Sequence, residues 1–257
     1  MKWYAVLFLP AALLVSFLFL PMARLFLSAD PHTLGETLGD PSVLRAIGLT
    51  LYASGVSTLI GLITGVPLAY VLSRKEFPLK GLLEGVVRLP LVVPHLAAGV
   101  ALLLTFGRGF FLGRALGDLG LRFVSSVPGI VIAMLFVSSP LLVISAREAF
   151  DKVPARMEGV ARTLGASPWR AFWTVSLPLA WRGVVSGCLM MWARGISEFG
   201  AIVVLAYHPM VASTLLFERL EGYGLEYAQP VAVILLAVCL GIFLGVQLAA
   251  WREHGEG

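Results

Sequence analysis

The feature that most constrains this sequence is a series of six long apolar stretches. They cover approximately residues 3–27, 44–73, 83–106, 127–148, 178–206 and 231–251. An α-helix needs roughly 20 mostly apolar residues to cross the hydrocarbon core of a bilayer. The sequence is 58% hydrophobic and 13% charged, whereas a soluble domain carries about 25% charged residues. We therefore predict an all-α membrane protein in which residues 1–257 form a single transmembrane domain of six helices, rather than an unusually apolar soluble protein.

The first apolar stretch has two interpretations. Lys2 precedes an apolar run from Trp3 to Leu20, which is the charge pattern of a secretory signal peptide. That run is longer than the roughly 7–15 residues of a signal-peptide core, and no clear A-x-A cleavage site follows it. We therefore expect a retained transmembrane helix, with a cleaved signal peptide as the alternative.

The distribution of Lys and Arg predicts the orientation, because cytoplasmic loops of membrane proteins are enriched in these residues. With the N-terminus inside, 12 of the 19 basic residues fall on inner segments, 6 fall on outer segments, and Arg194 lies within a span. The inner set is Lys2, Arg74, Lys75, Lys80, Arg88, Arg147, Lys152, Arg156, Arg162, Arg170, Arg182 and Arg252. The outer set is Arg24, Arg45, Arg108, Arg114, Arg122 and Arg219. Both termini are therefore predicted to be cytoplasmic.

Nucleic-acid and metal partners have little support in the sequence. The net charge of +4 follows from the inner-loop bias and requires no nucleic-acid partner. Cys188 and Cys239 both fall in predicted spans, where small packing residues are expected rather than a disulfide or metal ligands. No CxxC motif or Cys/His cluster is present, so we expect no metal site.

The third apolar stretch contains the sequence RLPLVVPHLAAGV, in which Pro90 and Pro94 lie four residues apart and His95 follows directly. Proline lacks a backbone donor and interrupts a helix. Broken backbone at membrane depth is tolerated only where it is buried in protein or lines a cavity. We expect a kink here, either next to a transport pathway or as a simple packing kink. His95 is expected to be a hydrogen-bonded interior residue rather than a ligand.

The longest predicted cytoplasmic segment, residues 149–177, has the pattern of two short helices. Pro154 can precede a helix over residues 155–164, and Gly165 is a natural helix stop. Ser167 and Pro168 have the residue types of an N-cap and a first helical position. We therefore predict that a second helix begins at Ser167-Pro168.

The first of these helices is two-faced. Its apolar stripe consists of Met157, Val160, Ala161 and Leu164, and the charged residues off that stripe are Arg156, Glu158 and Arg162. Such a helix could lie flat on the membrane surface or present one face to another protein. The sequence does not assign either face to a partner.

The same segment resembles the cytoplasmic coupling loop of binding-protein-dependent ABC importer permeases. The family pattern is Glu-Ala-Ala, three residues, Gly, nine residues, Ile, one residue and Leu-Pro. The matching positions are Ala161, Gly165, Leu177 and Pro178, with Val175 in place of the Ile. Gly159 and Val160 depart from the pattern, and Glu158 stands one place upstream of the family's glutamate. These departures leave the role of a single carboxylate open.

A second stretch, from Ala193 onward, is similar to the permeases of molybdate and tungstate importers. Ser197-Glu198-Phe199-Gly200 is shared with that group and with sulfate permeases. The following Ala206-Tyr207-His208-Pro209 and Pro230-Val231-Ala232-Val233 favour molybdate or tungstate, and residues 88–102 fit the same group. The resemblance implies a molybdate/tungstate importer, with a sulfate/thiosulfate importer as the alternative.

The resemblance implies a type I ABC importer permease in the cytoplasmic membrane of a prokaryote. Its implied partners are a second copy of the chain, two ATP-binding subunits and an extracytoplasmic oxyanion-binding protein. ATP and Mg would belong to the ATP-binding subunits, because none of the four lysines here precedes the Ser or Thr of a Walker A motif. Coupling to the ATPase is implied for Arg156, Glu158, Gly159, Ala161, Arg162, Thr163, Leu164, Gly165, Ala166, Ser167 and Pro168.

The transport pathway is predicted from charged and helix-breaking residues. An intramembrane ionisable residue is a functional candidate by default, yet Glu198 would repel an anion. Arg194 lies one turn earlier, so we predict a structural Arg194–Glu198 ion pair near a gate rather than direct substrate contact. Pairing of Glu198 with another helix is the alternative. The pathway and gate candidates are Pro90, Pro94, His95, Arg194, Ser197, Glu198, Phe199 and Gly200.

Two other classes of function are weaker alternatives. A membrane-embedded enzyme would need a motif such as His-Glu-x-x-His or paired intramembrane aspartates, and neither is present. An ion-driven secondary transporter often has inverted repeats and charged residues at the midplane. This sequence has only the Arg194–Glu198 pair and no obvious repeat. We therefore expect a transport subunit without catalytic residues or a cofactor of its own.

Overall fold

The computed structural model describes residues 2–252, with side chains for residues 8–244, and every regular element in this part of the chain is a helix. The side chains of Lys2 and Arg252, which were counted in the inner charge set, lie outside the described residues. Among these described residues, five helices are long and apolar enough to cross a membrane, and a sixth span results if one bent pair is counted. The predicted all-α membrane fold is confirmed.

The candidate spans follow the apolar stretches of the sequence. The five single candidates are Phe8–Leu27, Pro41–Arg74, Val127–Lys152, Pro168–Ile196 and Leu225–Leu244. The bent pair joins Lys80–Leu91 to His95–Phe106 at an angle of 113°. Pro94 directly precedes the second helix of the pair, and its missing backbone donor prevents one helix from continuing into the other. The kink predicted in the third apolar stretch is therefore present.

The chain divides into two compact units, Met1–Ile47 with Leu215–Gly257 and Gly48–Thr214. The first unit holds α1 (Lys2–Leu27), α2 (Pro31–Gly39), the start of α3 (Pro41–Arg74), most of α12 (Ala212–Tyr223), and α13 (Leu225–Arg252). Asp30 caps α2 by accepting a hydrogen bond from the Thr33 N–H at 3.0 Å. Gln229 of α13 donates to the Leu25 carbonyl at 3.3 Å and to Ser28 Oγ at 2.8 Å, which ties α13 to the end of α1.

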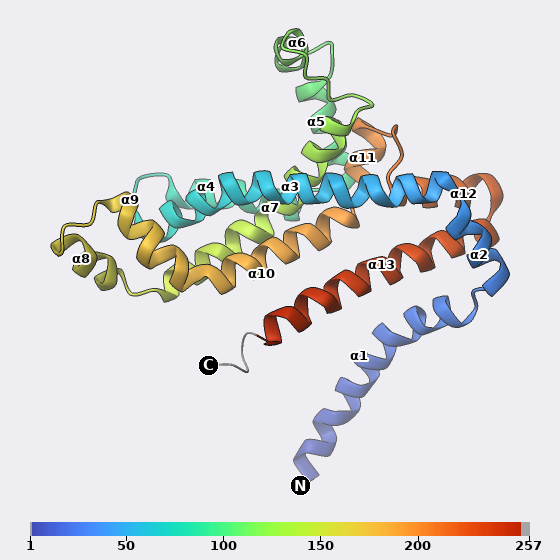
Figure 1. The fold of residues 1–257 in the computed structure, drawn as a ribbon, viewed down its shortest axis with the longest axis horizontal. Helices are drawn as coiled ribbons and strands as arrows, with labels where there is room; N and C mark the ends of the chain where they lie inside the picture. The colour runs from blue at the N-terminus through green and yellow to red at the C-terminus, as the bar shows by residue number, and fades with distance from the viewer. Residues whose placement is uncertain (1, 253–257) are drawn as a thin grey trace. The chain divides into compact units, whose positions relative to one another are not determined.

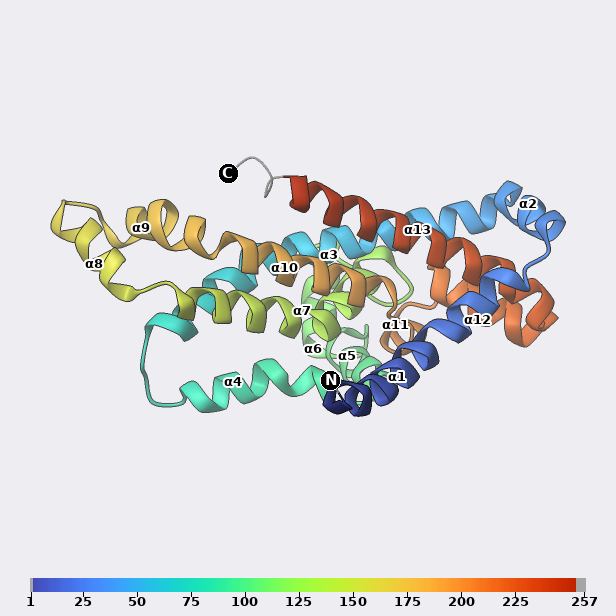
Figure 2. The ribbon, with the colours of Figure 1, turned by 90° about the horizontal axis from the view of Figure 1, so that it is seen from below.

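The second unit is built around α7 (Val127–Lys152) and α10 (Leu177–Ile196), which pack side by side as a hairpin (Figure 1). Small residues permit this close approach. A Cβ on Gly187 would lie 3.0 Å from Ser145 Cβ, and Ser145 Oγ donates to the Gly183 carbonyl at 2.9 Å. Figure 2 shows α8 (Ala155–Thr163) and α9 (Pro168–Ala171) at the end of this hairpin. The segment predicted to couple to an ATPase is therefore the tip of the hairpin.

Two buried apolar clusters hold the second unit together. The first includes Met134 of α7 with Ile202 and Leu205 of α11 (Gly200–Leu205). The second includes Leu72 of α3 and Phe150 of α7, together with residues of α10. The first cluster lies next to the broken helices and the second next to the attachment of α8, so each one positions a candidate site.

The structure departs from the expected continuous span over residues 178–206. The long helix ends at Ile196, and α11 begins at Gly200. Local polar bonds account for the break: Ser197 Oγ donates to the Arg194 carbonyl at 3.0 Å, and the carboxylate of Glu198 accepts from the Ala201 N–H at 2.8 Å. At its other end the helix is longer than expected, because α9 and the π-helix η2 (Phe172–Ser176) run directly into α10.

Candidate functional site

The first candidate site is α8, whose C-terminus is fixed by a glycine. Gly165 has a φ of +92°, a conformation that side chains with a Cβ rarely adopt. Its N–H donates to the Arg162 carbonyl at 3.0 Å, and the Ala166 N–H donates to the Ala161 carbonyl at 3.0 Å. These two bonds form a Schellman cap. The predicted helix stop at Gly165 is confirmed.

The next helix begins as predicted at Ser167 and Pro168. Ser167 Oγ accepts a hydrogen bond from the Arg170 N–H at 3.2 Å, and Pro168 occupies the first helical position. At the other end of α8, Val153 caps α7 through a bond from its N–H to the Phe150 carbonyl at 3.0 Å. Thus α8 is connected to the hairpin by two short links of defined geometry.

A polar cluster formed by Tyr70, Arg74, Glu158 and Ser176, here called the Glu158 cluster, anchors α8 to the hairpin and to α3. Glu158 Oε1 accepts from Arg74 Nε at 2.6 Å and from Ser176 Oγ at 2.7 Å. Its Oε2 accepts from the Tyr70 hydroxyl at 2.8 Å. Arg74 Nη2 also donates to the Val153 carbonyl at 2.9 Å. The carboxylate therefore joins α8 to α3 and η2, and Arg74 extends the cluster to the link after α7.

The Glu158 cluster is largely shielded from solvent, with side-chain exposures of 11% for Arg74 and 14% for Glu158. Burial acts to raise the pKa of Glu158, but hydrogen bonds from Ser176, Arg74 and Tyr70 act in the opposite direction, and the net pKa is lowered. The carboxylate is consequently ionised at neutral pH. A charge-assisted pair of this kind is strong as long as both partners remain.

The apolar stripe of α8 is largely exposed on the surface of this chain. Met157 is 45% exposed, Val160 53% and Leu164 84%. Glu158 of the charged face is therefore turned toward the rest of the chain, and Val160 and Leu164 of the apolar stripe are largely exposed, while Met157 also lines a cavity with Leu179 and Ala180 of α10. The structure therefore shows which face of α8 is attached to the rest of the chain, which the periodicity alone did not determine.

Three members of the Glu158 cluster were missed in the sequence. Arg74 was recognised only as an inner-loop charge, and Tyr70 and Ser176 gave no signal. Tyr70 and Glu158 are 88 residues apart, and Arg74 and Glu158 are 84 residues apart. Only the packing of α3 against the hairpin brings them together, so periodicity and capping rules could not find the cluster.

The second candidate site lies where two helix breaks meet. One break separates α4 (Lys80–Arg88) and the 3₁₀ turn η1 (Leu89–Leu91) from α5 (His95–Phe106), and the other separates α10 from α11. Glycines allow the two short helices to touch: a Cβ on Gly200 would lie 2.6 Å from His95 Cβ, and one on Gly99 would lie 2.8 Å from Val204 Cβ. His95 and Glu198 are thereby brought to the same place.

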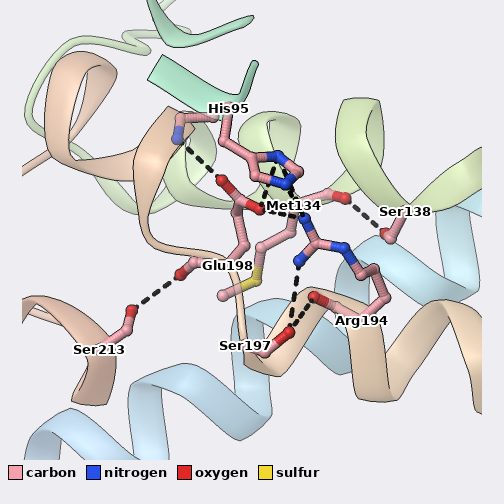
Figure 3. A network of polar contacts seen from close by, with 8 residues as sticks. His95, Met134, Ser138, Arg194, Ser197, Glu198 and Ser213 are labelled. Carbon is pink, nitrogen blue, oxygen red and sulfur yellow. Dashed lines mark hydrogen bonds and ion pairs between the residues drawn. The ribbon is translucent and has the colours of Figure 1, made fainter. Parts of the chain in front are cut away.

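The side chains at this junction form a polar network (Figure 3). Arg194 Nη2 donates to Glu198 Oε2 at 2.9 Å and lies 2.9 and 3.1 Å from Nε2 and Nδ1 of His95. Arg194 Nη1 donates to Ser197 Oγ at 3.3 Å. Nδ1 of His95 is also 3.6 Å from Glu198 Oε2. The predicted Arg194–Glu198 pair is present, and His95 joins it from a different helix.

Burial differs sharply across the network. The side chain of Glu198 is 1% exposed, that of Arg194 24% and that of His95 49%. Glu198 thus lies behind the two nitrogen-bearing side chains, which face a cavity of about 590 Å³. The residues that line this cavity are Pro94, His95, Leu96, Arg194, Ser197, Glu198, Phe199 and Gly200.

Seven of the eight predicted pathway residues line this one cavity, together with Leu96. Pro90 does not belong to it, because it is buried in η1. Within the described residues, no group of three or more His, Cys, Asp or Glu side chains could hold a metal ion. The site is therefore a cationic and hydroxyl-bearing cavity with a buried carboxylate behind it.

The sequence matches a known family over most of its length. Residues 57–254 match the family described as binding-protein-dependent transport system inner membrane component.

Individual relatives carry more specific names. The molybdate/tungstate transport system permease protein of Thermococcus kodakarensis is 44% identical over 243 residues, which is 94% of this chain and 93% of the relative. A probable sulfate transport system permease protein of Zygnema circumcarinatum is 32% identical, over 88% of this chain and 81% of the relative.

A solved structure has the same fold. It is a bacterial ABC transporter involved in the import of the acidic polysaccharide alginate, and its matching chain superposes with a TM-score of 0.76. The alignment covers 97% of this chain and 94% of that chain at 19% sequence identity. The likeness establishes the arrangement of helices found in ABC importer membrane subunits.

Proposed function

Because the chain belongs to the family of binding-protein-dependent transport system inner membrane components, we propose that it is the permease of an ATP-driven importer for molybdate or tungstate. The observation that carries the substrate is the 44% identity to a molybdate/tungstate permease over nearly the full length of both chains. The sulfate permease relative is more distant, at 32% identity. Sulfate or thiosulfate is accordingly the second candidate substrate.

The coupling role is proposed for α8 and its flanking residues. The exposed side chains of Met157, Val160 and Leu164 supply an apolar surface that a groove of an ATP-binding subunit can cover. The Glu158 cluster holds the other side of α8 on the hairpin and on α3. A displacement of α8 by the ATPase is then transmitted to α3, α7 and α10. The cluster connects α8 to α3 through Tyr70 and Arg74, to the end of α7 through the Val153 carbonyl, and to the start of α10 through Ser176.

The proposed assembly contains two copies of this chain, two ATP-binding subunits and an extracytoplasmic oxyanion-binding protein. ATP and Mg are bound by the ATP-binding subunits, which supply the energy. The permease supplies the route through the membrane, and the binding protein delivers the oxyanion. In this proposal both termini of the chain lie in the cytoplasm, as the Lys and Arg distribution predicts.

The pathway is proposed to pass the junction of the two helix breaks. Interrupted helices at membrane depth expose backbone groups that need protein or water around them. Ionisable side chains in spans are costly unless they are paired or face a wet cavity. Here the cavity provides space for water beside the broken helices, and the Arg194–Glu198 pair provides each ionisable side chain with a partner. We expect the pair to stabilise the junction in the resting permease.

The experiment that tests this function is transport in proteoliposomes that contain the permease with its ATP-binding subunit. The binding protein is loaded with molybdate, tungstate or sulfate in turn, and anion uptake is measured beside ATP hydrolysis. ATP-dependent uptake of molybdate or tungstate is expected. Coupled uptake of sulfate alone would retain the importer and overturn the substrate. Uptake in vesicles that lack any ATP-binding subunit would indicate an ion-driven transporter instead.

A further inference from the structure

We propose that His95, Arg194 and Ser197 form a transient binding site for a tetrahedral oxyanion inside the permease, with Glu198 as its resident counter-ion. The inference rests on the proposed function and goes beyond it, because it assigns substrate contacts to the permease itself. It also differs from a purely structural role of the Arg194–Glu198 pair.

The first argument is the position of the polar side chains. Two broken helices place His95 at the start of α5 and Ser197 just beyond α10, on the same cavity. A cation in a membrane-spanning protein is stable only where it is paired or reaches a hydrated space. Arg194 does both, since one side of its guanidinium contacts Glu198 and the residue is still 24% exposed at its side chain.

The second argument is the supply of hydrogen-bond donors that face the cavity. The guanidinium of Arg194 has five N–H groups in a planar fork that suits tetrahedral oxyanions. Ser197 Oγ donates to the Arg194 carbonyl at 3.0 Å, so its hydroxyl must turn away from that carbonyl to donate to an oxyanion. His95 contributes a half-exposed imidazole ring whose nitrogens lie 2.9 and 3.1 Å from Arg194 Nη2. All three belong to the lining of one cavity of about 590 Å³. An oxyanion there is met from two different helices.

The third argument is the way Glu198 is held. Its side chain is 1% exposed, and its two oxygens accept from the Ala201 N–H and from Arg194. Ser213 Oγ donates to its backbone carbonyl at 2.8 Å. Glu198 is therefore fixed behind Arg194 and cannot turn into the cavity without losing these bonds. It neutralises Arg194 when the site is empty.

This arrangement favours weak, reversible binding. An uncompensated Arg194 would hold a dianion tightly, and a transport site must release its ion as readily as it accepts it. The Glu198 carboxylate behind the guanidinium repels every anion and partly neutralises Arg194, so it lowers the affinity for all oxyanions alike. The site is therefore suited to all tetrahedral oxyanions, and the discrimination between molybdate and sulfate is left to the binding protein.

The test is equilibrium binding of radiolabelled molybdate to the purified permease–ATPase complex without binding protein. Glu198→Gln removes the counter-ion, so molybdate affinity is expected to rise by roughly tenfold or more. The double variant Glu198→Gln/His95→Gln is expected to lose that gain. Glu36→Gln on the exposed helix α2 is the matched control and is expected to leave binding unchanged. Unaltered affinity of an assembled Glu198→Gln complex would overturn the proposal.

A second measurement covers the case in which Glu198→Gln does not assemble. His95→Gln changes a half-exposed side chain, and its uptake rate in proteoliposomes is expected to fall about tenfold while binding-protein-stimulated hydrolysis persists. His32→Gln on α2 is its control. Normal uptake by His95→Gln would overturn the oxyanion site alone. Failure of the unaltered complex to import any oxyanion would instead overturn the proposed function.

Discussion

At the scale of single residues, two carboxylates that are largely shielded from solvent organise the parts of this permease that are expected to move. Glu158 ties α8 to α3 through Arg74 and Tyr70. Glu198 ties the end of α10 to α11 and faces Arg194 and His95. Each carboxylate is surrounded by donors from several helices, so removing it leaves buried donors without a partner. That loss is costly compared with the loss of an exposed ion pair.

Glu158→Ala is expected to destabilise the attachment of α8 by about 2 kcal/mol, because it removes the only carboxylate that the largely shielded Arg74 contacts among the described residues. In proteoliposomes with the ATP-binding subunit, less uptake per ATP hydrolysed is expected. The matched control is Glu148→Ala, since Glu148 is an exposed residue of α7. Equal uptake per ATP in the two variants would contradict an anchoring role for Glu158.

The lowered pKa of Glu158 predicts a pH effect of defined sign. A carboxyl group whose pKa is lowered by folding stabilises the fold fully above its unfolded pKa of about 4.3, and this contribution is lost as the pH falls through the folded-state pKa. As the pH is lowered from about 4.3 through the folded-state pKa, the thermal unfolding temperature of the wild type should therefore fall more steeply than that of Glu158→Gln. Parallel pH profiles for the two proteins would argue against the ionised cluster.

The variant Glu198→Gln tests whether this residue affects the rate of transport or the preference for one oxyanion over another. Because Glu198 is buried and paired with Arg194, the variant is expected to slow uptake of every oxyanion and to impair assembly more than selectivity. Uptake of molybdate and sulfate is measured in competition, beside ATP hydrolysis. A changed preference for molybdate over sulfate with hydrolysis still coupled would contradict this expectation.

At the scale of helices, local sequence rules predicted the ends of elements better than their interruptions. The stop of α8 at Gly165 and the start of α9 at Ser167-Pro168 follow from the preferences of single residue types, and both were found in the structure. The kink before His95 followed from Pro94. The break at Ser197–Phe199 was missed because it contains no proline or glycine. It depends on the bond from the Ala201 N–H to the Glu198 carboxylate and on the bond from Ser197 Oγ to the Arg194 carbonyl.

The contacts between helices were beyond these rules for a different reason. Gly200 and Gly99 have no signature in the sequence that distinguishes close packing from flexibility. The structure shows that each faces another helix at a distance that excludes a side chain. The pathway residues were therefore predicted individually, and only the packing of α5 on α11 shows that seven of them line one cavity.

Gly200→Ala tests the contact between α5 and α11. The added Cβ would lie 2.6 Å from His95 Cβ, so α5 must shift, at a cost of about 1–3 kcal/mol. Lower thermal stability and reduced oxyanion uptake are expected. Gly55→Ala in α3 is the control, because a Cβ at Gly55 meets nothing within 4 Å in the chain. Equal behaviour of the two variants would show that the close packing is not required.

At the scale of the whole molecule, the apolar stretches determined the fold class and the family resemblance determined the function. Six spans were expected, and the described part of the chain has five single candidates and one bent pair. The orientation of the termini, the homodimer and the ATPase contacts remain predictions. They depend on lipid and on partner subunits, whose positions are not encoded in the local pattern of one chain. The exposed apolar stripe of α8 is the feature of this chain that connects it most directly to such a partner.

The measurement that tests the central claim most directly compares Leu164→Asp with Leu119→Asp in proteoliposomes containing the ATP-binding subunit and the oxyanion-loaded binding protein. Both leucines are highly exposed, at 84% and 77%, but only Leu164 belongs to the apolar stripe of α8. If α8 couples ATP hydrolysis to transport, Leu164→Asp should abolish ATP-dependent oxyanion uptake and Leu119→Asp should retain it. Full uptake by Leu164→Asp would contradict the coupling role of α8.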